Sequence, residues 1–455
     1  MITGKRRDGR AAIWRLLQCL LSTFLLPISV AAVADAVSLK LDIRSSFELA
    51  RERAPSLMLA SYKVEVADAE RDLAKAQILP QVNVFGEWSE NQIEYRGGLL
   101  APADREYSGE RYGLQARQTI FNMADWKKVS VQSALLQQSK SNLASSEARL
   151  LRQVTGAYLS VLLSDADEEY LKSELSGLKR QLQEAEALFN AKLLPLTDLL
   201  ETRARHDRVH AELIAAKGAT AIARERFIQL VGERDFELLP TKSDIALGPS
   251  SADLQAAIDR AHRDSPDVRA AADALRAAEE QVELERGSRL PKVYLSFNSQ
   301  YSDVGFDNLT SPPRDTETLQ LSVNFPLFEG GGGGARVRRA WGRFYASQSE
   351  LAMVRLEVET SVRSAWLALG TSIEQVAAAR QAVTSAEVSL DAARKSVGAG
   401  TAKFTDVLLS LAILTGANRD LSAAIFNQIN AWVELEVAIG MNPQNVAANL
   451  FRLIH

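Results

Sequence analysis

Cysteine is almost absent from this chain of 455 residues, because Cys19 is the only one. Long apolar runs are also scarce: no stretch after residue 36 approaches the roughly 20 apolar residues of a membrane-spanning helix. The net charge is only −4, with 24% of residues charged. This balance excludes a nucleic-acid-binding surface and a disordered charged tail. If the chain enters a membrane, it does so with strands.

The first 34 residues have the features of a secretory signal peptide. Basic residues come first, the segment from Leu16 to Val30 is mostly apolar, and Ala32-Val33-Ala34 offers a small-x-small cleavage site. An N-terminal anchor helix is the alternative, but this apolar run is short for spanning a membrane. Removal of residues 1–34 takes Cys19 away and excludes disulfides, thiol catalysis and thiolate metal sites. Cys19 also lacks the small preceding residue of a lipoprotein signal.

The rest of the chain contains one pattern twice, at 35–240 and 252–455, joined by a linker at 241–251. Leu79-Pro80 matches Leu290-Pro291 at an offset of 211 residues, and Thr197-Asp198 matches Thr405-Asp406 at an offset of 208. Such matches keep their order and spacing over the whole repeat, which chance does not produce. The sequence therefore predicts an internal duplication.

Each copy begins with a predicted helix of about 35 residues, near 44–78 and 252–289, which ends at a Leu-Pro pair because proline stops a helix. Two strands follow in each copy, at 81–95 and 106–121 and at 291–304 and 316–328. Apolar and polar residues alternate along them, most regularly from Leu319 to Leu327, which predicts one oily and one polar face. The tyrosines suitably placed for interfacial aromatic girdles are Tyr95, Tyr107, Tyr112, Tyr294 and Tyr301.

A helix of about seventy residues comes next, at 123–192 and 335–397, and its length would be on the order of 100 Å. Its apolar residues recur at heptad spacing, as in Leu369, Val376, Val383 and Leu390, which is typical of a coiled-coil seam. A short break precedes a returning helix at 197–231 and 404–440. We interpret the five glycines before the second long helix as a strand–helix hinge: Gly330, Gly331, Gly332, Gly333 and Gly334.

Four strands of about twelve residues cannot close a barrel, because eight is the practical minimum. In lipid, an open sheet edge would leave backbone groups unpaired. If these are membrane strands, a dimer, trimer or tetramer must share one barrel of roughly 8, 12 or 16 strands. The predicted fold is therefore mainly α with membrane β, internally duplicated and oligomeric.

With these features the chain resembles the TolC family of outer-membrane channel proteins, over about residues 40–440. The motifs that carry the resemblance, besides the doubled layout and the Leu-Pro pairs, are Gln118-Thr119-Ile120-Phe121-Asn122 with Trp126, Phe325-Pro326-Leu327-Phe328-Glu329-Gly330-Gly331, Phe189-Asn190-Ala191-Lys192-Leu193 running to Asp198 with Ala204-Arg205 and Asp207, and Val397-Gly398-Ala399-Gly400 running to Thr405-Asp406-Val407-Leu408. The resemblance implies a homotrimer whose long coiled-coil helices form a periplasmic α-barrel below a shared transmembrane β-barrel of about 12 strands. It further implies the cell outer membrane as location, with outer-membrane lipid around it. A periplasmic adaptor (membrane fusion) protein and an inner-membrane ABC or RND transporter would be its partners.

The resemblance also places a periplasmic entrance at the breaks between long and returning helices, where Asp198 and Asp406 match the family's acidic position. Three Asp406 carboxylates at a constriction would attract cations and repel anions. A helix N-cap is the alternative of equal weight, because each aspartate follows a threonine at the start of a returning helix, and one residue can do both. The nearby departures from well-known family members, which leave the closing of the entrance undecided, are Val397, Ala402 and Leu409.

Other chemistry finds little support in the sequence. The glycine run lacks a following Gly-Lys-Ser/Thr, so we do not expect a nucleotide site. His206 and His210 are four residues apart, but a solvated helix face outweighs a metal pair. Arg336, Arg338 and Arg339 would meet lipid headgroups or lie in solvent, and both interpretations stay open. We expect no enzyme activity, no cofactor, no metal and no nucleic acid.

The sequence thus predicts the outer-membrane channel-tunnel of a tripartite export system, which passes substrate from an inner-membrane transporter and adaptor to the exterior. Type I protein secretion and multidrug efflux are the two expected uses. The missing lipoprotein cysteine and the TolC-like 189–207 segment favour secretion, although the cargo is not encoded in any motif. The alternative is a periplasmic coiled-coil structural or adaptor protein without a pore, and the alternating strands with terminal aromatics argue against it.

Overall fold

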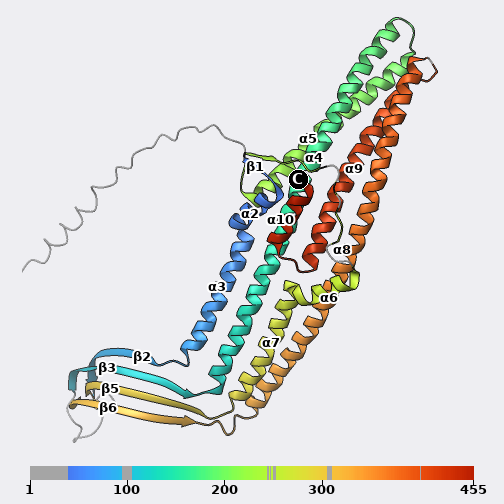
Figure 1. Ribbon diagram of the computed structural model, residues 1–455. Helices are drawn as coiled ribbons and strands as arrows, with labels where there is room; N and C mark the ends of the chain where they lie inside the picture. Colours follow the sequence, from blue (N-terminus) through green and yellow to red (C-terminus); the bar gives the residue numbers. More distant parts are fainter. Residues whose placement is uncertain are drawn as a thin grey trace, which may run out of the picture.

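The computed structural model describes residues 39–94, 105–242, 245, 247–249, 253–304, 310–399 and 401–455. The predicted signal peptide, Tyr95 with the first strand tip, part of the linker, and Gly400 lie outside the described residues. The molecule is elongated, with four strands at one end and two helical hairpin tips at the other (Figure 1).

The two repeats contain the same series of elements, which confirms the predicted duplication. The first consists of α2 (Ile43–Arg53), α3 (Pro55–Ala76), β2 (Gln81–Ile93), β3 (Arg105–Phe121), α4 (Met123–Asn190) and α5 (Leu196–Val231). The second consists of α6 (Leu254–Asp264), α7 (Pro266–Gly287), β5 (Lys292–Val304), β6 (Thr310–Asn324), α8 (Gly332–Gly398) and α9 (Phe404–Ala438). Outside this pattern lie β1 (Leu39–Leu41), β4 (Phe236–Leu238) and α10 (Pro443–Ile454).

The first predicted helix of each repeat is in fact two helices. Pro55 begins α3 and Pro266 begins α7, after helices of 11 residues each. Proline has no N–H to donate to the preceding turn, and it disfavours the helical conformation in the residue before it. Ala54 accordingly has ψ of 117° and Ser265 has ψ of 127°. The prediction of an unbroken helix of about 35 residues was wrong for this reason.

The four long strands form one antiparallel sheet in the order β2-β3-β5-β6, so β2 and β6 are its two edges. The register places Val84 opposite Leu114, and Phe297 opposite Leu319, on one apolar face. Asn83 opposite Gln115, and Asn298 opposite Thr318, lie on the polar face. Val84 is 82% exposed and Leu319 is 71% exposed. The apolar face is therefore bare in a single chain.

The last strand differs from the predicted range 316–328. It begins at Thr310 and ends at Asn324, which pairs with the first residue of β5, Lys292. Because β5 has no residue left to pair beyond Lys292, Phe325 to Phe328 continue without strand structure, and Pro326 could not donate to a ladder. Alternation alone does not show where the partner strand stops.

The helices continue the order of the strands. α3, α4, α7 and α8 pack side by side in that order, and toward the tips α4 pairs with α5 and α8 with α9 (Figure 1). Leu171 and Leu178 of α4 pack with Val209 and Leu213 of α5, as expected for a coiled-coil seam. None of the helices that the structure describes is both long and apolar enough to cross a membrane.

A small module surrounds the middle of α4. β1 and β4 pair in parallel, and Phe47 of α2, Ile258 of α6 and Leu450 of α10 share one core with Tyr158 of α4. Tyr158 is fully buried and donates a hydrogen bond to the Leu239 carbonyl at 2.7 Å. Burial raises the pKa of Tyr158 far above its usual value. This hydroxyl therefore stays protonated and anchors the module to the long helix.

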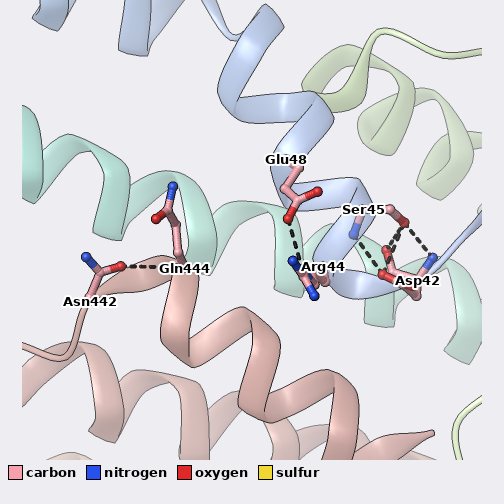
Figure 2. Close-up of polar contacts among 6 residues, drawn as sticks. All are labelled: Asp42, Arg44, Ser45, Glu48, Asn442 and Gln444. Atoms are coloured by element: carbon pink, nitrogen blue, oxygen red, sulfur yellow. Dashed lines mark hydrogen bonds and ion pairs between the residues drawn. The ribbon is translucent and has the colours of Figure 1, made fainter.

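Polar caps fix the first turns of α2 and α10 in this module (Figure 2). The Asp42 carboxylate accepts from the Ser45 backbone N–H at 2.7 Å, and the Ser45 hydroxyl accepts from the Asp42 N–H at 3.0 Å. The Asn442 side chain accepts from the Gln444 N–H at 2.9 Å. Each cap satisfies N–H groups that have no partner within the helix, so the two short helices begin at defined positions against α4.

Candidate functional site at the helical tips and the strand–helix junction

Each long helix turns back at the end of the molecule far from the strands (Figure 1). After α4 the chain turns through Lys192, which has a φ of 62°, the only positive φ outside glycine among the described residues. α5 then begins after Pro195, and α9 begins after Lys403. These two turns are the breaks at which the sequence predicts the entrance.

Asp198 and Asp406 lie in the first turns of α5 and α9, but neither is an N-cap. Pro195 and Lys403 occupy the cap positions, and each aspartate is the third helical residue. Asp406 Oδ2 accepts from the Lys403 backbone N–H at 3.0 Å, and Asp198 Oδ1 accepts from the Thr197 hydroxyl at 3.1 Å. A carboxylate in the first turn is favoured by the helix dipole. Asp406 thus supports the start of α9 while its side chain remains exposed.

The two hairpins of one chain are joined by apolar contacts near the tips. Val397 packs with Ala185 and Leu199 of the first hairpin. Leu408 and Leu411 of α9 pack with the seam between α4 and α5. A Cβ added at Gly177 would lie 3.3 Å from Leu411 Cδ2, so glycine allows the close approach of these helices. Of the three noted departures, Val397 is therefore a packing residue, Ala402 is half-buried and Leu409 is 62% exposed.

Farther from the tips, polar contacts that sequence reasoning missed join α9 to α4. The Arg419 guanidinium binds both Asp167 carboxylate oxygens, with Nη2 at 3.0 Å from Oδ2. One turn away, the Tyr170 and Ser422 hydroxyls are 3.2 Å apart. In the sequence, the only indication of these contacts is that Asp167 and Tyr170, and likewise Arg419 and Ser422, are three residues apart. Polar residues on any solvated helix face have the same spacing, so the contacts could not be predicted.

A second missed pair lies inside the first hairpin. Arg205 Nη2 of α5 is 2.6 Å from Glu174 Oε1 of α4, and the Glu174 side chain is only 3% exposed. Arg205 belongs to a motif that supports the family resemblance, but the motif alone assigned it no role. A buried carboxylate requires a paired charge, so Arg205 holds the two helices of this hairpin together.

The glycine run at the strand–helix junction divides into two parts. Gly330 and Gly331 have φ of 59° and 84°, which L-residues rarely adopt. Gly332 to Gly334 already belong to α8. The turn thus needs two glycines, and the predicted hinge of five differs from the structure because three of them continue into a regular helix. In the first turns of α8, Arg336 Nη2 lies 2.5 Å from Oε2 of Glu329, which precedes the glycine run.

His206 and His210 share one face of α5, with ring centroids 6.5 Å apart. His206 Nδ1 lies 3.0 Å from Asp207 Oδ1. The described part of the chain contains no group of three or more His, Cys, Asp or Glu side chains arranged to hold a metal ion. The imidazole pair therefore has no third ligand there.

Comparisons with known proteins agree with this architecture. The family model described as "Outer membrane efflux protein" matches residues 47–233 and 257–441, once in each repeat. The alkaline protease secretion protein AprF of Pseudomonas aeruginosa is 28% identical, over 94% of this chain and 89% of its own length. The outer membrane protein TolC of Vibrio cholerae is 24% identical, over 91% of this chain and 95% of its own length. The crystal structure of the outer membrane protein VceC from Vibrio cholerae is 19% identical and has a TM-score of 0.74, covering 88% of this chain and 96% of its own.

The solved structure shows the same fold, and the family model covers most of both repeats. The doubled strand–helix layout, the helical tips and the matched segments all agree with this family. The chain therefore belongs to the outer membrane efflux protein family and is an outer-membrane channel protein that serves secretion or efflux.

Proposed function

We propose that three copies of this chain close into one export channel, with a shared barrel of about twelve strands above a tunnel of long helices. The observation that carries the proposal is that the sheet and the helical layer are both open at two edges. β2 with α3 forms one edge of the chain, and β6 with α8 forms the other. In lipid the strand edges must be paired, and pairing β6 of one copy with β2 of the next satisfies them.

Exposed apolar stripes on the two edge helices support the same contact. On α3, Leu59, Tyr62, Val66 and Leu73 are each 57–63% exposed and follow coiled-coil spacing. On α8 the corresponding exposed residues are Tyr345, Met353, Leu356 and Leu367. A contact between two different faces repeats around a ring if the rotation closes. The family resemblance implies that the ring contains three copies.

The internal duplication supplies the register of this contact. Within one chain α4 packs on α7, where Ser141 Oγ is 3.3 Å from Asp273 Oδ2. The repeat offsets of 208 residues from α4 to α8 and 211 from α7 to α3 carry this pair to Ser349 and Tyr62. If copies join as the repeats do, Ser349 lies opposite Tyr62 across the interface between copies.

Cysteine cross-linking tests this arrangement, because replacing Cys19 by serine leaves a background without cysteine. In the full chain in detergent, Tyr62→Cys with Ser349→Cys should form disulfide-linked dimers and trimers. Tyr62→Cys with Leu367→Cys is the matched control, since Leu367 lies on the same stripe but about 27 Å farther along the helix. A ladder longer than three would contradict the closed trimer. Monomers alone would favour the periplasmic protein without a pore.

The proposed cargo is polypeptide in type I secretion. Two relatives carry secretion in their names, AprF and the proteases secretion protein PrtF of Dickeya chrysanthemi. The proposed partners are a periplasmic adaptor and an inner-membrane ABC transporter, with an RND pump as the efflux alternative. In this proposal the channel guides passage and carries out no covalent chemistry.

Asp198 and Asp406 are the proposed acidic residues of the periplasmic entrance. Their place in the first turns of α5 and α9 puts them at the end of the molecule that would face the adaptor. Three copies would bring six such carboxylates to one narrow opening, which attracts cations. At the opposite end, the proposed hinge is the pair Gly330 and Gly331, which lets the chain turn from β6 into α8.

A further inference from the structure

Basic side chains gather where the four strands meet the helices. Six residues form this group, which we call the basic collar: Arg117, Arg289, Lys292, Arg336, Arg339 and Arg343. The carboxylates among them are Glu285 and Glu329, and Asp125 lies close by, where it accepts from Asn122 Nδ2 at 2.6 Å. The six collar cations therefore outnumber these three carboxylates two to one.

The strand members of the collar lie on the polar face of the sheet. Arg117 pairs with Gln81 and Ser296 in the register, and its guanidinium lies 4.2 Å from the centre of the Tyr294 ring. Lys292, two residues before Tyr294 on β5, shares this face because side chains alternate along a strand. Both residues thus point away from the apolar face that carries Val84 and Leu319.

The other members of the collar lie on α8 and in the turn that follows α7. Arg336 Nε and Arg339 Nη2 approach the nearly buried Glu285 at 3.6 and 3.5 Å. Arg289 lies in the turn after α7, where its Cγ is 3.6 Å from the position that a Cβ at Gly333 of α8 would take. Arg343 is one turn beyond Arg339 and lies on the same face of α8. Farther along that stripe of α8, Glu350 and Glu357 line a groove with Asn142 of α4.

Aromatic residues occupy the other side of this junction, at the start of α4 and of α8. Trp126 packs edge-on against Phe121, which pairs with Val293 on the apolar face of the sheet. The rings of Trp341 and Tyr345 stack with their centroids 5.6 Å apart. Trp341 is two residues from Arg339 and therefore lies on a different face of α8. Trp and Tyr are the residues that favour a membrane–water interface. In the proposed channel, the side that carries Trp126 and Trp341 therefore faces outward, toward lipid and the neighbouring copy, and the collar faces the lumen.

Four of the six collar members have no ion pair among the described residues: Arg117, Lys292, Arg289 and Arg343. The other two, Arg336 and Arg339, are engaged by Glu285 and Glu329. We infer that the collar is an anion-attracting ring inside the channel, which acts on small anions and on the acidic side chains of passing polypeptide. This inference rests on the proposed channel. Three copies concentrate the positive field in a narrow passage with low-dielectric walls.

Ion selectivity of the reconstituted full-length channel tests the collar. Arg289→Gln with Arg343→Gln removes two exposed charges per chain, and Arg276→Gln with Arg355→Gln is the matched control. The control likewise removes two arginines per chain, Arg276 from the face of α7 opposite Glu285 and Arg355 from a face of α8 away from Arg339 and Arg343. Reversal potentials in potassium chloride gradients measure the chloride-to-potassium permeability ratio of each variant.

We expect the collar variant to lower this ratio by about twofold at 0.01 M salt, with the difference shrinking toward 1 M, where the Debye length is about 3 Å. The control variant should keep the wild-type ratio. Wild-type channels should also be blocked by millimolar tripolyphosphate, and the collar variant should resist this block. Conducting channels with an unchanged ratio in the collar variant would overturn the inference and leave the proposed function intact. An equal change in the control would also overturn it, because net charge alone would then be responsible. Absence of conductance in the wild type would overturn the channel itself.

Discussion

Replacing Gly440 by alanine should destabilise the protein much more than the same change at Gly232, its counterpart in the other repeat. Both glycines follow a returning helix, with φ of 86° and 74° respectively. A side chain in this left-handed region costs about 1–2 kcal/mol. The two sites therefore start with the same backbone penalty.

Their surroundings differ. A Cβ at Gly440 would lie 2.5 Å from the backbone carbonyl carbon of Asp264, between α6 and α7. A Cβ at Gly232 would meet only the flexible Arg53 side chain, at 3.3 Å. Moving packed backbone adds an overpacking cost of about 1–3 kcal/mol, so Gly440→Ala should cost about 2–5 kcal/mol in total.

Thermal unfolding of the detergent-solubilised variants, followed by circular dichroism, measures this difference. Hydrogen exchange should locate the Gly440→Ala effect in α6 and α10, which pack beside the turn. If Gly232→Ala were equally or more destabilising, the close backbone approach at Gly440 would not be the cause, and the reasoning would be refuted.

Three further predictions concern polar groups outside the strands. Arg205→Gln should destabilise the first hairpin by about 3–5 kcal/mol in thermal unfolding, because it leaves the Glu174 carboxylate buried and unpaired. Adding Glu174→Gln should restore much of the lost stability. Absence of this recovery would contradict the pairing of Arg205 with Glu174. Burial lowers the pKa of His455 in the folded protein. The stabilising contribution of the neutral imidazole is therefore present above the pKa of the unfolded chain, near 6.5, and is lost as the pH falls below that value. The melting temperature should drop more from pH 7.5 to 5.5 in wild type than in His455→Asn, and equal drops would contradict this. Arg419→Gln should speed hydrogen exchange where α9 meets α4, as should Asp167→Asn, and the double variant should add little; fully additive effects would show that the two residues act separately.

The large-scale architecture was predictable because it depends on periodic patterns. Alternation over Leu319 to Val323 and heptads through Leu369 and Val376 identify strand and coiled coil independently of tertiary contacts. Because the chain is duplicated, each of these patterns can be checked in both repeats. Element ends were less predictable, because they depend on partners: β6 stops where β5 stops, and the helix before each strand pair breaks at Pro55 and Pro266.

The tip contacts show the limit of sequence reasoning most clearly. Asp198 and Asp406 were found through the family motif, yet their place in the first helical turn depends on where Pro195 and Lys403 cap the helices. Asp167 and Arg419 are 252 residues apart, and nothing in either segment indicates the other. Such pairs arise from the packing of two hairpins and become visible only in the structure.

Single-channel recording tests the central claim most directly. Purified full-length protein in a planar bilayer should produce discrete conductance steps, and Asp406→Ala should weaken their cation preference. Asp420→Ala is the matched control, on the same helix about 21 Å from Asp406, and should behave as wild type. Steps that are insensitive to Asp406→Ala would retain the channel and remove the acidic entrance. Folded, oligomeric protein that never conducts would contradict the claim that this chain forms a pore.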